Sequence, residues 1–231
     1  QKRFVQHLVE VMAKKSRKKK DKKLSEAGLE ASDDADRLLQ EACESGNVKA
    51  ARRACQSANV NLVARRASVP GESLLCYVCE KGRRDLAQLL IEHGADVKQA
   101  SDNGFSPLFV ACLLGTAYLD IIRLVLAKGA DVNQAVKDGT SPLCIASQTG
   151  HVDVCRLLLA NGARVNQRRN DGAFPLYVAS QLGLVDVVRL LLEKGADVEQ
   201  TTNDSTSPFF IACQLLQLDV ARLLLRCQPA Q

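Results

Sequence analysis

The sequence predicts an all-α repeat solenoid, and two observations carry that prediction. The stretch from Asp138 (DGTSPLCIASQTGHVDVCRLLLANGARVNQ) returns at Asp171 (DGAFPLYVASQLGLVDVVRLLLEKGADVEQ), an offset of 33 residues. Self-similarity at a fixed period of this size indicates a stack of copies of one supersecondary unit. The chain has no Trp, and aromatic residues make up 4% of it. A stack of small helices packed through Ala, Leu and Val needs less aromatic bulk than a compact core, so the composition agrees.

Each copy is expected to fold as a turn followed by two short helices. In the first copy, Asp-Gly is a turn signal, and Ser141 is placed to cap a helix over 142–148 that opens with proline. Gly150 interrupts that helix, and apolar residues at helical spacing predict a second one over 152–160. Gly162 then ends it in the left-handed conformation. Helices of about two turns are unstable alone in water, so neighbouring copies must bury each other's apolar faces.

Read together, the turn and the motifs SPLxxAS, GHVDVxRLLL and GAxVN resemble the ankyrin repeat, over roughly residues 33–227. The resemblance implies stacked helix-turn-helix units with β-turn or hairpin fingers. It also implies a concave surface that binds protein partners through the finger tips and the exposed ends of the first helices. The function expected from it is a scaffold or adaptor for protein–protein interaction.

The repeat pattern divides the chain into successive segments. The first helix of the N-terminal segment is expected to start at Ser32-Asp33-Asp34, where acidic residues suit the helix dipole. The final segment has Leu216 where other repeats have glycine, so it is either an atypical cap or a cut in a longer array. The expected division is a basic, disordered tail over 1–31, a degenerate N-terminal capping unit over 32–67, ankyrin repeats over 68–101, 102–136, 137–169 and 170–202, and a partial fifth repeat or C-terminal cap over 203–231.

The positive charge of the chain is concentrated in its first 23 residues. They hold ten Lys or Arg against two acidic residues, a net charge of +8, whereas the whole chain carries +5 and the remainder therefore −3. Such a run serves nuclear import, binds nucleic acid or acidic membranes, or only solubilises a disordered tail. The densest part, a nuclear-import-like candidate, comprises Lys14, Lys15, Arg17, Lys18, Lys19 and Lys20.

No secretory signal or membrane-spanning stretch is visible in the sequence, and Met12, the only Met, is a candidate native start. Nine cysteines invite a disulfide or metal interpretation, but Cys43, Cys79, Cys112 and Cys213 share a repeat position that Ser fills elsewhere. A small packing residue explains that alternation better than a ligand does. Unbridged cysteines indicate an intracellular compartment, cytoplasmic or nuclear. The sequence assembles no nucleophile with a base and no phosphate loop, so we expect neither enzyme activity nor a cofactor or metal.

The expected partner site follows from the resemblance. Leucines stand just before the inter-helix turn, where polar residues would keep an idle surface soluble, so a protein partner held there is the first hypothesis. The alternatives are that these leucines pack onto the neighbouring repeat, that acidic finger tips only build turns, or that the array is a structural spacer. The candidate partner-binding residues are Phe105, Leu113, Leu114, Thr140, Gln148, Gln181, Leu182, Gln214 and Leu215.

A second hypothesis makes the chain a nuclear or nucleic-acid-associated regulator that acts through the basic tail. Nucleic acid is the weaker expectation of the two, because no aromatic residues interleave with the basic ones to stack on bases. The expected oligomeric state is a monomer. The identity of the protein partner does not follow from the sequence.

Overall fold

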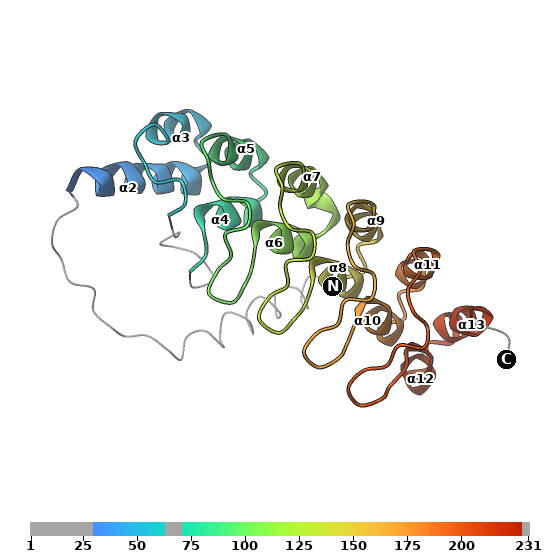
Figure 1. Ribbon diagram of the computed structural model, residues 1–231. Helices are drawn as coiled ribbons and strands as arrows, with labels where there is room; N and C mark the ends of the chain where they lie inside the picture. Colours follow the sequence, from blue (N-terminus) through green and yellow to red (C-terminus); the bar gives the residue numbers. More distant parts are fainter. Residues whose placement is uncertain (1–29, 63–70, 228–231) are drawn as a thin grey trace. The chain divides into compact units, whose positions relative to one another are not determined.

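A computed structural model describes residues 30–62 and 71–227, with side chains from Asp34 onward. Within these ranges the chain is all helical, with twelve α-helices, one short 3-10 helix and no strand (Figure 1). The predicted all-α repeat architecture is therefore confirmed. The first helices of successive pairs are α2 (Glu30–Ser45), α4 (Leu74–Glu80), α6 (Pro107–Leu114), α8 (Pro142–Gln148), α10 (Pro175–Gln181) and α12 (Pro208–Gln214). The second helices are α3 (Val48–Ala54), α5 (Arg84–Glu92), α7 (Leu119–Ala127), α9 (Val152–Ala160), α11 (Val185–Glu193) and α13 (Leu218–Arg226).

The chain divides into two compact bodies. Of the described residues, those within Gln1–Leu114 and Asp120–Ala130 form the N-terminal body, and those within Gly115–Leu119 and Asp131–Gln231 form the C-terminal body. In the described part of the N-terminal body, α2 packs on α3 and α4 on α5, while α4 also contacts α6. In the C-terminal body, α8, α10 and α12 pack in one row and α9, α11 and α13 in a second row. Each short helix thereby gains the apolar cover that it lacks alone.

The copy that starts at Asp138 folds as its sequence predicts. Its helices span Pro142–Gln148 and Val152–Ala160, and the Ser141 hydroxyl accepts a hydrogen bond from the Cys144 N–H at 3.1 Å. Gly162 ends the second helix with φ at +85°. Helix bounds and caps are local properties, so one repeat contains all the information that sets them.

The start of the first helix departs from the expectation. We expected the start at Ser32, with residues 24–31 as a linker or a fraying helix, and α2 begins at Glu30. Glu and Ala are strong helix formers, so the helix continues upstream past the serine and aspartates that were read as its start. The rest of the expected tail, with the basic run of residues 14–20, lies outside the described residues.

The expected fingers are tight turns closed by backbone hydrogen bonds. In the N-terminal body the Ser101 N–H donates to the Phe105 carbonyl at 3.0 Å. The same bond recurs in the C-terminal body between Val136 and Thr140, at 3.0 Å. The turn is so short that it forms a hairpin-like loop without strands. The equivalent bonds join Arg169 to Ala173 at 2.7 Å and Thr202 to Thr206 at 3.0 Å.

Successive repeats are tied together by asparagine and glutamine side chains. The Asn133 Oδ1 accepts from the Arg164 N–H at 2.8 Å, and the Gln167 Nε2 donates to the Asn133 carbonyl at 3.3 Å. The next repeat repeats the link, since Asn166 Oδ1 accepts from the Asp197 N–H at 3.0 Å. Asn61 makes the matching bond to Asp96 in the N-terminal body, at 2.7 Å. These bonds satisfy loop backbone groups between repeats and fix the spacing of the fingers.

In the turns between paired helices, side chains from the following repeat pack closely against glycines. In the C-terminal body, His151 lies against Gly115, and Gln217 lies against Gly183, so closely that a Cβ on either glycine would overlap the neighbouring side chain. Burial lowers the pKa of His151. The extra residues of one turn form a 3-10 helix, Thr116–Tyr118. Leu216 occupies a glycine position and adopts the same left-handed conformation, with φ at +57°.

Candidate functional site

The C-terminal ends of the first helices meet along one row in the C-terminal body. Gln148, Gln181 and Gln214 are the last residues of α8, α10 and α12, and Leu182 and Leu215 are the C-caps of α10 and α12. The three helices pack side by side, α8 on α10 and α10 on α12 (Figure 1). We call this set of five residues the helix-end surface. It comes from residues that repeat at the 33-residue period and therefore occupy equivalent places.

The helix-end surface exposes apolar side chains in two adjacent repeats. Leu182 is 44% exposed and Leu215 is 45% exposed. The preceding repeat carries Thr149 at that position, and Thr149 is buried, with its hydroxyl bonded to the Ile145 carbonyl at 2.9 Å. The two leucines are therefore open to solvent at a repeat position where the threonine is buried. Exposed leucines that recur in register are typical of a contact surface.

The glutamines beside these leucines are unengaged. Gln148 and Gln181 are half-buried and Gln214 is exposed. Within residues 30–62 and 71–227, none of the three amides has a hydrogen-bond partner in another side chain or in the backbone. Each amide offers two donors and a carbonyl acceptor. The helix-end surface thus combines apolar contact area with free, uncharged hydrogen-bonding groups.

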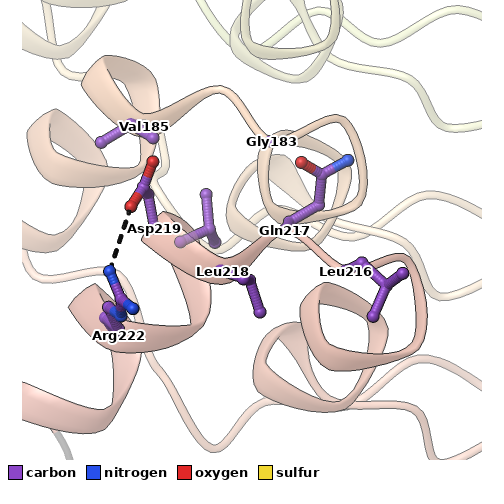
Figure 2. Close-up of a pocket in the computed structure, with 8 residues that line it drawn as sticks. Gly183, Val185, Leu216, Gln217, Leu218, Asp219 and Arg222 are labelled. Carbon is purple, nitrogen blue, oxygen red and sulfur yellow. Dashed lines mark ion pairs between the residues drawn. The ribbon is translucent and has the colours of Figure 1, made fainter.

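A hollow of about 330 Å³ lies at the turns that follow Leu182 and Leu215 (Figure 2). Leu216 and Leu218 are both exposed beside it. The Asp219 carboxylate and the Arg222 guanidinium form an ion pair at 3.8 Å on the same lining (Figure 2). The hollow is therefore lined by polar and charged groups as well as by leucine side chains. The full lining is Gly183, Val185, Leu216, Gln217, Leu218, Asp219, Val220 and Arg222.

Three of the candidate residues are buried, and a fourth, Leu114, is half-buried. Phe105 is 6% exposed, because its ring packs on Phe109 with the centroids 5.4 Å apart. Thr140 is buried at the base of its finger, where its N–H donates to Asp138 Oδ1 at 2.8 Å. Leu113 is buried as well, since α6 is apolar along its whole length, and Leu114 is half-buried. The fingertip and the α6 leucines therefore do not provide the exposed anchors that we expected.

The acidic finger tips follow the alternative interpretation. Asp138 accepts from the Thr140 N–H, and Asp171 Oδ1 accepts from the Ala173 N–H at 3.0 Å. Asp171 also pairs with Arg169 at 3.0 Å. These carboxylates stabilise their own turns, as Asp commonly does in such loops.

The cysteines lie where small packing residues are needed, with two exceptions. Cys79 and Cys144 are fully buried, and burial raises the pKa of each thiol to about 12. Cys76 is buried on the same helix as Cys79. Cys213 and Cys227 are exposed, contrary to the packing role expected for Cys213. Across the described residues, no group of three or more His, Cys, Asp or Glu is placed to hold a metal ion.

Glu72 is an unusual residue that the sequence did not single out for this reason. Its side chain is only 2% exposed, and its Oε2 has no hydrogen-bond partner. Burial raises the pKa of its carboxyl to about 8, with the nearby Glu80 carboxylate adding to the shift. The repeat alignment could have indicated that Glu72 is buried, because the equivalent residues are apolar or small: Phe105, Thr140, Ala173 and Thr206.

The comparison with known families agrees with the geometry. The family described as "Ankyrin repeats (3 copies)" matches residues 39–136, 118–202 and 168–231. The chain therefore belongs to the ankyrin repeat family. Proteins of this family are in general protein–protein interaction modules. The comparison with curated proteins returns no match. No helix in residues 30–62 and 71–227 is both long and apolar enough to cross a membrane.

Proposed function

We propose that the chain is a scaffold or adaptor that binds a protein partner on the helix-end surface of its C-terminal body. The observation that carries the proposal is the exposure of Leu182 and Leu215 at equivalent positions of adjacent repeats. Removing apolar area from water stabilises a complex by about 25 cal/mol per Å². Leu182 and Leu215 are both close to half exposed, and the exposed Leu216 and Leu218 follow Leu215 in the sequence, so all four offer apolar area for such burial.

The surface also defines the chemistry of the partner segment. The helix-end surface carries no charged residue, so a partner charge buried against Leu182 or Leu215 would stay unpaired at a high cost. The free amides of Gln181 and Gln214 suit backbone or hydroxyl groups of the partner. We therefore expect an uncharged segment with at least one apolar side chain that fits the hollow beside Leu216.

The test is to replace both leucines with Gln (Leu182→Gln and Leu215→Gln) and to measure binding of the proteins that the wild-type chain captures from cell lysate. We expect affinity for a purified captured partner to fall at least about tenfold, since hot-spot truncations cost about 2 kcal/mol or more. Leu38→Gln is the matched control, because Leu38 is somewhat more exposed than Leu182 and Leu215 but lies on α2 in the other body. Binding that survives the double change would contradict the proposal.

Binding without catalysis is part of the proposal. The helix-end surface offers aliphatic and amide groups, and neither kind gains or loses a proton near neutral pH. The buried thiols of Cys79 and Cys144 stay protonated at neutral pH because their pKa is raised to about 12, so they are poor nucleophiles. Proteins of the ankyrin family are typically non-enzymatic, which agrees with this reading.

A second candidate function rests on the basic run of Lys14, Lys15, Arg17, Lys18, Lys19 and Lys20. In it, the chain is a nuclear or nucleic-acid-associated regulator that acts through this segment. Phosphate binding releases counterions, so affinity for any DNA should fall steeply with salt. The comparison of residues 1–231 with residues 24–231 by fluorescence anisotropy tests it. Equal affinities, or a flat salt response, would remove this candidate.

A further inference from the structure

The contact between α2 and the start of α4 differs in chemistry from the later contacts of its kind. Gln40 lies on α2, and Glu72 directly precedes Ser73, the N-cap of α4. Their equivalents in the later repeats form four further pairs, which are Cys76 with Phe105, Phe109 with Thr140, Cys144 with Ala173, and Tyr177 with Thr206. None of these four pairs contains a carboxyl group. The first contact is therefore the one at which the chain pairs an acid with a side-chain amide.

The later pairs show that these two repeat positions touch. In the N-terminal body the Cys76 Sγ donates to the Phe105 carbonyl at 3.5 Å. In the C-terminal body Cys144 and Ala173 belong to one buried cluster. The helices α2 and α4 pack on each other as α4 packs on α6 and α8 packs on α10 (Figure 1). The amide on α2 and the carboxyl before α4 therefore lie against each other, within the N-terminal body.

Both side chains are buried, and each has an oxygen without a hydrogen-bond donor. Gln40 is 5% exposed and Glu72 is 2% exposed. The Gln40 Oε1 and the Glu72 Oε2 have no hydrogen-bond partner. The Gln40 Nε2 is already engaged, because it donates to the Glu44 Oε1 at 2.8 Å. Two facing acceptors that have lost their hydration destabilise the contact unless a hydrogen lies between them.

One proton on Glu72 satisfies both oxygens. A protonated carboxyl has a hydroxyl donor, so its Oε2 can donate to the Gln40 Oε1. The surroundings favour this proton, because burial raises the pKa of Glu72 to about 8 and the Glu80 carboxylate adds to the shift. An ionised Glu72 would instead hold a buried charge against the Gln40 oxygen, which is costly.

The cations near this contact already have acceptors. Lys81 opposes the shift at Glu72, but its ammonium pairs with Glu80 at 2.9 Å. Arg83 donates to the carbonyl of Cys43. Neither cation therefore replaces the proton on Glu72. The titratable groups around the contact are Cys76, Cys79, Glu80 and Lys81 on α4, Cys43 and Glu44 on α2, Arg83 before α5, and Asp102 beside Gly71.

We infer that the contact between Gln40 and Glu72 makes the docking of the first helix pair, α2 and α3, depend on a proton. The protonated Glu72 holds this pair on α4, and the ionised Glu72 releases it. The contact belongs to the N-terminal body and shares no residue with the helix-end surface, so the inference does not depend on the proposed function.

The sign of the pH dependence follows from linkage. In the undocked state Glu72 is solvated, and its pKa returns to about 4.3. In the docked state its pKa is about 8, so between these two values the docked state holds one more proton than the undocked state. The docking constant should therefore fall about tenfold per pH unit across this window and stay level above about pH 8.

Hydrogen exchange of the full chain, followed by mass spectrometry from pH 5 to pH 9, tests the inference. Protection of α2 and α3, corrected for intrinsic exchange, should fall about tenfold per pH unit and level off near pH 8, whereas α9 and α11 should show no such slope. Glu72→Gln should abolish the slope, because an amide donates to the Gln40 Oε1 at every pH. Glu41→Gln, an exposed change on α2, is the matched control and should keep the slope of the wild type.

Gln40→Leu tests the pairing itself, with the carboxyl signal of Glu72 followed by NMR. This change removes an acceptor from the protonated form and a repelling oxygen from the ionised form, so Glu72 should lose its proton at a lower pH than in the wild type. An unchanged or higher titration midpoint would overturn the inference. So would a flat profile in the wild type, a slope that survives Glu72→Gln, or the same slope in every described helix, which would mean unfolding of the whole chain.

Discussion

Equivalent helix ends in the two bodies, at α4 in one and at α10 and α12 in the other, differ in chemistry. In the N-terminal body, α4 ends in Glu80 and Lys81, which form an ion pair at 2.9 Å. The Lys81 ammonium also lies 5.3 Å from the centroid of the Tyr77 ring. In the C-terminal body the equivalent positions hold Gln181 with Leu182 and Gln214 with Leu215, uncharged and partly open to solvent. The fold determines where these residues lie. The two side chains at each helix end determine whether their groups make contacts within the chain or remain exposed for a partner.

Burial differs between the bodies even where the residue is the same. Phe109 on α6 and Phe210 on α12 occupy equivalent repeat positions. Phe109 is fully buried, whereas Phe210 is 59% exposed. Identity and position within a repeat therefore do not determine exposure, since the side chains around the residue decide it.

The largest expected effect uses this pair. Phe109→Ala should lower the free energy of unfolding by about 3–5 kcal/mol, because it leaves a cavity in a packed core. Phe210→Ala, the matched control, should cost less than about 1 kcal/mol, since its ring is mostly solvated. Urea denaturation followed by circular dichroism measures both. Equal losses of unfolding free energy in the two variants would contradict the expected difference between Phe109 and Phe210.

The next effect concerns the buried Glu72 carboxyl. Its folded pKa of about 8 lies above the value of about 4.3 for an unfolded chain, so the folded state holds the proton more tightly. Its contribution to stability is full below about pH 4 and is lost as pH rises through about 8. Glu72→Gln should therefore remove this pH dependence and stabilise the chain above pH 8, because a neutral amide avoids the cost of burying the ionised carboxylate.

Unfolding free energies measured from pH 5 to pH 9 check this. Glu193→Gln on α11 is the control, because Glu193 is exposed and its replacement should leave the pH profile unchanged. A Glu72→Gln chain with the wild-type pH profile would show that the carboxyl is ionised in the folded state.

The smallest expected effect comes from changing the end of α4 so that it resembles the ends of α10 and α12. Replacing Glu80 with Gln and Lys81 with Leu removes a surface ion pair, and such pairs contribute at most about 1 kcal/mol. The melting temperature should shift by only a few degrees. Calorimetry of the double variant measures it. A larger fall in the melting temperature would mean that the ion pair and its Tyr77 contact stabilise α4. The difference between the helix ends would then affect stability as well as binding.

The sequence by itself determined the repeat, most helix bounds and the caps. Ser141 and Gly162 act within a few residues of themselves, so local pattern suffices to place them. It also put Gln181, Leu182, Gln214 and Leu215 at the ends of the first helices, where they lie. The start of α2 was misplaced, because helix propensity upstream competed with an apparent cap.

Only the tertiary structure decided which of the repeated positions meet solvent. Phe105 and Thr140 looked like finger tips, yet neighbouring side chains and the turn itself bury them. Glu72 is buried for the same reason, and Phe210 is exposed because no following helix pair of the described chain covers it. Exposure depends on residues about 33 positions away in the adjacent repeat, and a pattern read within one repeat holds no information about them.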